Sequence, residues 1–186
     1  MAKRPFKNGL LRVVSLIIAC VLVGGGIGCS SPDSSISPEE LDLIEVEKEI
    51  EAPDFTIPAM EGGEITLAHL RGKPVVLNLW AKRCSPCRVE LPYFDVVARQ
   101  NENEVTIVTV NIEDSISEVK QFFGDSKVGF IVAIDANAQV APIYATGYIP
   151  TTIFIDSKGI IRYLKVGGFT DEEQLQACVT KIVGES

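Results

Sequence analysis

Two cysteines separated by two residues stand in the segment Trp80–Cys87, which reads WAKRCSPC. Cysteine thiolates bind zinc, form structural disulfides, or exchange disulfides with other thiols, and a C-x-x-C spacing serves all three purposes. The spacing alone therefore leaves three chemistries open for Cys84 and Cys87.

The elements around the pair favour a reactive thiol. A nearly continuous apolar run, Pro74–Trp80, predicts a strand buried on both faces of a sheet. A helix is predicted from Ser85 onward, with Pro86 suited to its first turn. Free N–H groups and the macrodipole at a helix start stabilise a thiolate. We therefore predict that Cys84 is the exposed nucleophile and that Cys87, one turn along, resolves a mixed disulfide.

The other two chemistries have less support. A zinc site needs about four ligands, and beyond the pair the predicted domain offers Cys178 and His69. Cys178 falls on the apolar side of the last predicted helix, which indicates a core position. A structural C-x-x-C disulfide closes too small a loop to stabilise a fold much. The sequence therefore favours a redox dithiol and predicts neither a metal ion nor another cofactor.

The N-terminal segment has the pattern of an export signal. Residues 1–12 carry four basic residues and no acidic one, and an uncharged apolar run follows up to Cys29. The residues Gly26–Gly28 before Cys29 resemble a bacterial lipobox, which predicts lipidation of Cys29. An uncleaved anchor and simple cleavage remain alternatives. Residues 1–29 are thus predicted as signal or anchor, 30–51 as a flexible acidic linker, and 52–186 as a domain outside the cytoplasm, held at the bacterial membrane.

Charge excludes one class of partner. The whole chain has a formal net charge of −8, and without the four basic residues of the signal 13 Lys and Arg stand against 25 Asp and Glu. Nucleic-acid binding needs clustered positive charge. No nucleic-acid partner is predicted.

Strand and helix patterns alternate after residue 52. Short strands are predicted around the turn MEGGE, which gives an N-terminal hairpin, and buried strands over Pro74–Trp80 and EVTIVTVNI. TTIFIDSKGIIRYLKV predicts a second hairpin, and the last helix is predicted to begin at a capping box of Thr170 and Glu173. For Leu41–Glu51 the sequence leaves a short helix or an edge strand open. The pattern predicts an α/β fold, with a central mixed sheet and helices on both faces.

The motifs together resemble a known family. VVLNLWAKRCSPCRVELP, with APDFTI before it and GYIPTTIFIDSKGII after it, is similar to the membrane-anchored thioredoxin-like oxidoreductases of the TlpA/ResA type. This resemblance covers about residues 52–184. It implies a thioredoxin fold, with Cys84 and Cys87 as the redox pair.

The resemblance also implies roles for neighbouring residues. Pro150 matches a cis-proline that stands beside the redox pair and aligns the substrate backbone, and Ile149 before it would help to select the substrate. Glu90 occupies the position of an acid used in proton transfer, and Asn78 stands where cytoplasmic thioredoxins have a buried aspartate. Arg83 replaces a frequent aromatic residue and, with Trp80, is predicted at the substrate surface.

The predicted function is that of a membrane-tethered thiol–disulfide oxidoreductase acting on protein disulfides. The resemblance implies apocytochrome c or copper-site proteins as substrates and a transmembrane thiol donor of electrons. Two other protein classes share parts of this pattern. A peroxiredoxin would need Pro and Thr or Ser at fixed positions before its cysteine, and Trp80–Arg83 lacks them; a Sco-like copper carrier would need a C-x-x-x-C pair and a later histidine.

Overall fold

The computed structural model describes residues 41–144 and 147–185. Within them, six strands form one mixed sheet in the order β1-β8-β7-β4-β5-β6, and β2 and β3 pair separately. The strands are β1 (Ile44–Glu51), β2 (Thr56–Pro58), β3 (Glu64–Thr66), β4 (Val75–Trp80), β5 (Thr106–Asn111), β6 (Ile131–Ile134), β7 (Thr151–Ile155) and β8 (Ile160–Val166). The helices are η1 (Leu67–Leu70, 3₁₀), α1 (Ser85–Gln100), α2 (Ile116–Phe123), α3 (Ala141–Tyr144) and α4 (Glu172–Gly184).

The sheet changes direction at its centre. β4 runs parallel to β5 and antiparallel to β7, which continues into the β7–β8 hairpin. All six residues of β4 are buried, as the apolar run Pro74–Trp80 predicts. The predicted mixed sheet and the predicted second hairpin are confirmed.

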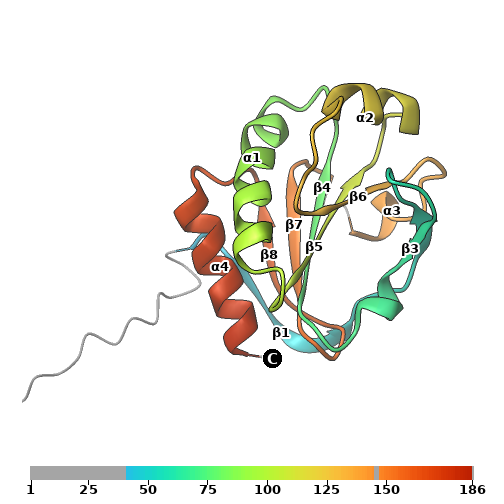
Figure 1. The fold of residues 1–186 in the computed structure, drawn as a ribbon. Coiled ribbons are helices and arrows are strands. Elements are labelled where there is room, and N and C mark those ends of the chain that lie inside the picture. Colours follow the sequence, from blue (N-terminus) through green and yellow to red (C-terminus); the bar gives the residue numbers. More distant parts are fainter. Residues whose placement is uncertain (1–40, 145–146, 186) are drawn as a thin grey trace, which may run out of the picture. The chain divides into compact units, whose positions relative to one another are not determined.

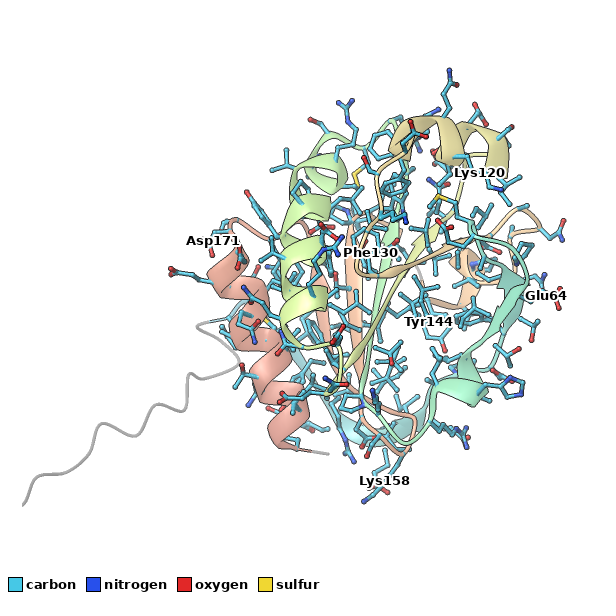
Figure 2. All side chains as sticks on the ribbon, viewed as in Figure 1. Glu64, Lys120, Phe130, Tyr144, Lys158 and Asp171 are labelled. Atoms are coloured by element: carbon cyan, nitrogen blue, oxygen red, sulfur yellow. A yellow bond between two sulfur atoms is a disulfide. The ribbon has the colours of Figure 1, made fainter. Side chains whose placement is uncertain are left out.

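Alternate residues of β4 face two different layers. Val76 and Trp80 belong to a core cluster shared with α1, α2 and α4, and Leu77 and Leu79 to a cluster shared with β2, η1 and α3. Figure 1 shows α1 and α4 together on one side of the sheet and β3 and α3 on the other. Tyr144 of α3 lies inside the second layer (Figure 2), and its hydroxyl donates to Pro53 O. Helices therefore cover both faces, as predicted.

The sheet begins within the segment 30–51 that was predicted as a flexible linker. β1 pairs antiparallel with β8 within residues 44–51, so the choice left open for this segment is an edge strand. Leu41 and Leu43 before it are buried in the first core cluster. The ordered fold thus includes part of the segment predicted as linker.

The cap of the last helix also differs from the prediction. Asp171 (Figure 2), not Thr170, is the N-cap of α4, and its carboxylate accepts the N–H of Gln174 at 2.8 Å. Thr170 instead donates its hydroxyl to Asp171 at 2.9 Å. A carboxylate at a helix start gains from the macrodipole as well as from the hydrogen bond, so Asp171 is the better cap.

Candidate functional site

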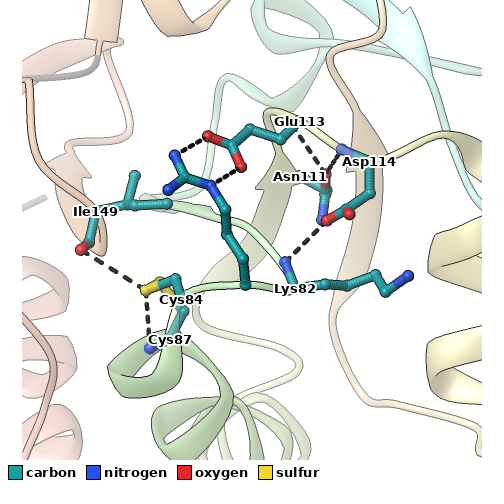
Figure 3. A network of polar contacts seen from close by, with 8 residues as sticks. Lys82, Cys84, Cys87, Asn111, Glu113, Asp114 and Ile149 are labelled. Atoms are coloured by element: carbon teal, nitrogen blue, oxygen red, sulfur yellow. Dashed lines mark hydrogen bonds and ion pairs between the residues drawn. A yellow bond between two sulfur atoms is a disulfide. The ribbon is translucent and has the colours of Figure 1, made fainter.

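The cysteine pair lies where β4 turns into α1. Cys84 and Cys87 form a disulfide, and Cys84 is the N-cap of α1. Cys87 N donates to Cys84 Sγ at 3.2 Å (Figure 3). Cys84 is half-buried, whereas Cys87 has no exposed surface. Once the bond is reduced, Cys84 Sγ is the sulfur that reaches solvent, with a helix-start N–H directed at it.

A cis peptide bond stands beside this disulfide. The bond joins Ile149 to Pro150, just before β7. Ile149 O lies 3.7 Å from Cys84 Sγ (Figure 3), and Pro150 O accepts the N–H of Gly167 at 2.9 Å. The structure therefore places Cys84 next to the Ile149–Pro150 segment, as the family resemblance implied, although Cys84 and Ile149 are 65 residues apart in the chain.

Glu90 lies on the inner side of α1 and is fully buried. Its Oε1 accepts from Asn78 Nδ2 at 2.9 Å, and its Oε2 accepts from Phe169 N at 3.0 Å. Burial raises the pKa of Glu90 from 4.5 to about 7, against the two hydrogen bonds and the charge of Lys165, which lower it. Glu90 is thus a carboxyl group that gains and loses a proton near neutral pH.

Gly168 marks how closely these groups approach one another. A Cβ atom at Gly168 would lie 3.5 Å from Pro86 Cβ, 3.6 Å from Glu90 Oε2 and 3.7 Å from Pro150 Cγ. The C-x-x-C turn, the buried carboxyl and the cis-proline therefore meet around one backbone position.

A second polar group holds the loop before Cys84. Asp114 Oδ2 accepts from Lys82 N at 2.8 Å and from Asn111 Nδ2 at 2.9 Å, as the dashed lines of Figure 3 show. Arg83 forms an ion pair with Glu113. The hydrogen bonding between these two side chains raises the pKa of Arg83 and lowers the pKa of Glu113. Because its guanidinium is paired with Glu113, Arg83 presents little free positive charge to Cys84.

Trp80 lies beneath this loop and is fully buried. Its ring packs against Phe122 and Phe123 of α2, with centroids 5.4 and 5.8 Å away. The packing part of its predicted role has a structural basis, and the side chain offers no exposed surface to a substrate in this state.

The sequence did not single out Lys165 and Asp42. Lys165 of β8 is buried, and its Nζ lies 2.8 Å from Asp42 Oδ2. Lys165 lies on the same face of β8 as the buried Tyr163, two residues earlier. This two-residue spacing is the sequence signal by which the inward lysine could have been found.

Three further points concern membrane anchoring and metal binding. Cys29 and the signal segment lie outside the described residues. Within residues 41–144 and 147–185, no cluster of three or more His, Cys, Asp and Glu residues could hold a metal ion. No helix in these same ranges is both long enough and apolar enough to span a membrane.

Comparisons with known proteins agree on one class. Residues 49–164 match the AhpC/TSA family. The chain is 33% identical to the thiol-disulfide oxidoreductase ResA of Bacillus cereus over 178 residues, which are 95% of this chain and 98% of that protein.

Solved structures extend this likeness to the fold. A putative thiol:disulfide interchange protein DsbE from Chlorobium tepidum is 28% identical, with a TM-score of 0.68 over 75% of this chain and 99% of that one. A thioredoxin family protein from Chlorobium tepidum TLS, at 23% identity, has a TM-score of 0.66 over 75% of this chain and 99% of its own. The predicted thioredoxin-like fold is thereby confirmed.

Proposed function

The chain belongs to the AhpC/TSA family and is a thiol–disulfide oxidoreductase of the ResA type, and from this premise we propose that Cys84 and Cys87 are its redox pair. The observation that carries the proposal is the disulfide at the start of α1, in which only Cys84 reaches solvent. It lies beside the cis Ile149–Pro150 bond and the buried Glu90.

The proposed reaction transfers two electrons from the dithiol to a protein disulfide. The Cys84 thiolate attacks one substrate sulfur, which forms a mixed disulfide and releases the other substrate sulfur as a thiolate. The Cys87 thiolate then attacks Cys84 Sγ, which releases the second substrate thiol and leaves the Cys84–Cys87 disulfide. An external dithiol must reduce the pair again, and we propose a transmembrane thiol donor for this step.

Glu90 is proposed to take the proton of Cys87. Cys87 has no exposed surface, so bulk water cannot remove its proton. Glu90 stands three residues later on the same helix, and a spacing of three residues places two side chains on one face. With a pKa of about 7, its carboxylate is a base matched to neutral pH.

Substrate binding is proposed along the segment around Ile149 and Pro150. Ile149 is partly exposed and its carbonyl oxygen points toward Cys84, so an extended substrate segment can align beside the disulfide. Arg83, at 77% side-chain exposure, would contact the partner at the opposite rim, and Trp80 would support that rim from below.

The proposed setting is the outer side of the bacterial membrane, with Cys29 as a lipid anchor, the following segment as a tether, and residues 52–186 within the redox domain. The basic and apolar N-terminal pattern supports export. Apocytochrome c or copper-site proteins are the proposed substrates, because ResA-type proteins are the relatives that match this chain nearly end to end.

The test is reduction of insulin or apocytochrome disulfides by the reduced protein. Cys84→Ser should abolish the reaction, because no thiolate is left at the exposed position. Cys178→Ala is the matched control, since Cys178 is buried in α4 and forms no disulfide, and it should retain activity. Full activity of Cys84→Ser would refute the proposal.

Two further measurements separate the alternatives. Hydrogen peroxide should not be consumed at a rate comparable with disulfide reduction, as a peroxiredoxin would require, and the reduced domain should not bind copper tightly. A reduction potential near that of thioredoxin, about −270 mV, is expected of a reductant, whereas a value near about −120 mV would indicate an oxidant.

A further inference from the structure

A buried cation lies behind the redox site. Lys165 of β8 is 2% exposed, its Nζ is 2.8 Å from Asp42 Oδ2, and it stands 5.4 Å from the centre of the Phe169 ring. A buried ammonium group is costly unless it is paired. Asp42 supplies that partner from outside, because its own side chain is 78% exposed.

Phe169 connects this cation to the proposed proton acceptor. Its ring lies under Lys165, and its N–H donates to Glu90 Oε2 at 3.0 Å. Lys165 is also the charged group whose attraction lowers the pKa of Glu90. A positive charge in this low-dielectric interior favours the carboxylate form of Glu90.

We propose that Lys165 is a positioning residue for the thiol–disulfide reaction, that Asp42 moderates its charge, and that together they set the pH range over which Glu90 accepts the proton of Cys87. The inference rests on the proposed function, because it takes Glu90 as the base of that reaction.

The other groups around Glu90 leave Lys165 as the charge that matters. Asn78 from β4 and Phe169 N from the segment before α4 are neutral donors. Cys178 of α4 lies in the same core cluster, and burial raises its pKa to about 12, so it stays neutral. On α1 itself, Cys84 and Cys87 titrate only when the disulfide is open.

The segment before β1 fixes Asp42 in place. Leu41 and Leu43, on either side of it, are buried in the core. Asp42 has a φ of 56°, a left-handed conformation that Asn also adopts readily. Asp42→Asn therefore keeps the backbone and an oxygen that accepts from Lys165, and removes only the negative charge.

This arrangement predicts shifts of opposite sign. Lys165→Met removes the positive charge near Glu90, so the carboxylate is less favoured and Glu90 titrates at a higher pH. Asp42→Asn leaves the positive charge of Lys165 unopposed, so Glu90 titrates at a lower pH. In the double variant Lys165 is absent, so the added Asp42→Asn substitution should reduce the upward shift of the Glu90 titration only slightly.

The experiment measures Glu90 directly in the full domain. The carboxyl carbon of Glu90 is followed by NMR against pH in the oxidised protein, and the pH dependence of mixed-disulfide resolution is measured in the reduced protein. Lys165→Met should move both midpoints upward by less than about one pH unit, because the charge of Lys165 lowers the pKa of Glu90 less than either hydrogen bond does. Asp42→Asn should move both midpoints downward. Lys181→Met is the charge-matched control, because Lys181 pairs with Glu185 near the C-terminus, and it should move neither.

Two outcomes would overturn the inference. One is an unchanged Glu90 titration in both variants, and the other is a shift of the same sign in both, which a purely structural role would produce. If Lys165→Met does not fold, Asp42→Asn carries the test alone, since Asp42 is exposed. The NMR result is independent of catalysis, so an unchanged titration leaves the proposed function standing, whereas an active Cys84→Ser would refute that function whatever the titration shows.

Discussion

Two carboxylates of the candidate site, Glu90 and Glu113, have different environments. Glu113 is 33% exposed and paired with Arg83, and that hydrogen bond lowers its pKa. Glu90 is fully buried and accepts two hydrogen bonds, and burial nevertheless raises its pKa to about 7. The same functional group therefore has a lowered pKa at the partly exposed Glu113 and a raised pKa, close to neutral pH, at the buried Glu90.

The difference shows that burial, more than the number of partners, decides the chemistry here. At the surface, water screens the Arg83–Glu113 pair, so the pair orients a loop and has little effect on stability. In the interior, the loss of hydration outweighs two hydrogen bonds to Glu90. Variants that exchange or remove each carboxylate test this comparison.

The largest expected effect is on activity. Glu90→Gln removes the proposed base while retaining size, so resolution of the mixed disulfide by Cys87 should slow by about 10²- to 10⁴-fold near pH 7. Rapid-quench trapping of the mixed disulfide measures this step. Glu113→Gln is the matched control and should resolve at the wild-type rate. An equal loss in both variants would contradict the assignment of proton transfer to Glu90.

The second effect is on the pH dependence of stability in the oxidised protein. Between pH 4.5 and 7 folded Glu90 keeps a proton that the unfolded chain has released, so stability falls as the pH rises through this window. The loss reaches about 3 kcal/mol above pH 7. Urea unfolding between pH 4 and 8 measures it.

The same unfolding series separates the two carboxylates. Glu90→Gln should show no such fall between pH 4.5 and 7. Glu113→Gln should keep it, because the lowered pKa of Glu113 contributes stability that is lost only as the pH falls below this window. A Glu90→Gln protein that still loses stability through the window would show that another group titrates there.

A third, smaller effect concerns the outer network. Asp114→Ala removes the acceptor of Lys82 N and Asn111 Nδ2, and should cost about 1–3 kcal/mol of unfolding free energy. Because Lys82 belongs to the loop that carries Cys84, the first attack on substrate should also slow. Urea midpoints and the rate of mixed-disulfide formation check both points, with Ser117→Ala in nearby α2 as a control. Wild-type values for both quantities would exclude a positioning role for Asp114.

The smallest effect is expected at Arg83. Its side chain is mostly exposed, and its ion pair is weakened by salt. Arg83→Gln should therefore lower the unfolding free energy less than Asp114→Ala does. Disulfide reduction on an uncharged peptide should be unchanged, while reduction of an acidic partner should fall. A large loss on the uncharged peptide would place Arg83 in the chemical step.

Much of the frame of the candidate site was predictable, because it depends on local sequence signals. The strand predicted from the apolar run up to Trp80 and the helix predicted from Ser85 are confirmed by the structure. Each of these depends on residues close together in sequence, where periodicity and capping chemistry are strong. The pairing of Cys84 with the Ile149–Pro150 segment needed the family resemblance as well.

The electrostatics behind the site was not predictable, since it depends on contacts between distant segments. Lys165 and Asp42 are 123 residues apart, and a lysine in a strand is usually exposed. Its burial depends on which face of β8 meets α4, and a shift of one residue would reverse that. The burial of Glu90 likewise depends on the backbone at Phe169, which helix periodicity cannot show.

β1 protects the molecule against association. A sheet edge offers unpaired N–H and C=O groups to which other chains can add, and β1 covers the edge that β8 would otherwise present. Its own outer edge carries the exposed glutamates Glu45, Glu47, Glu49 and Glu51, and its register breaks between Glu45 and Ile50. Repelling charges and an irregular register both hinder the addition of another strand. An oxidoreductase that acts on protein disulfides is in this way shielded from strand addition by its substrates at this edge.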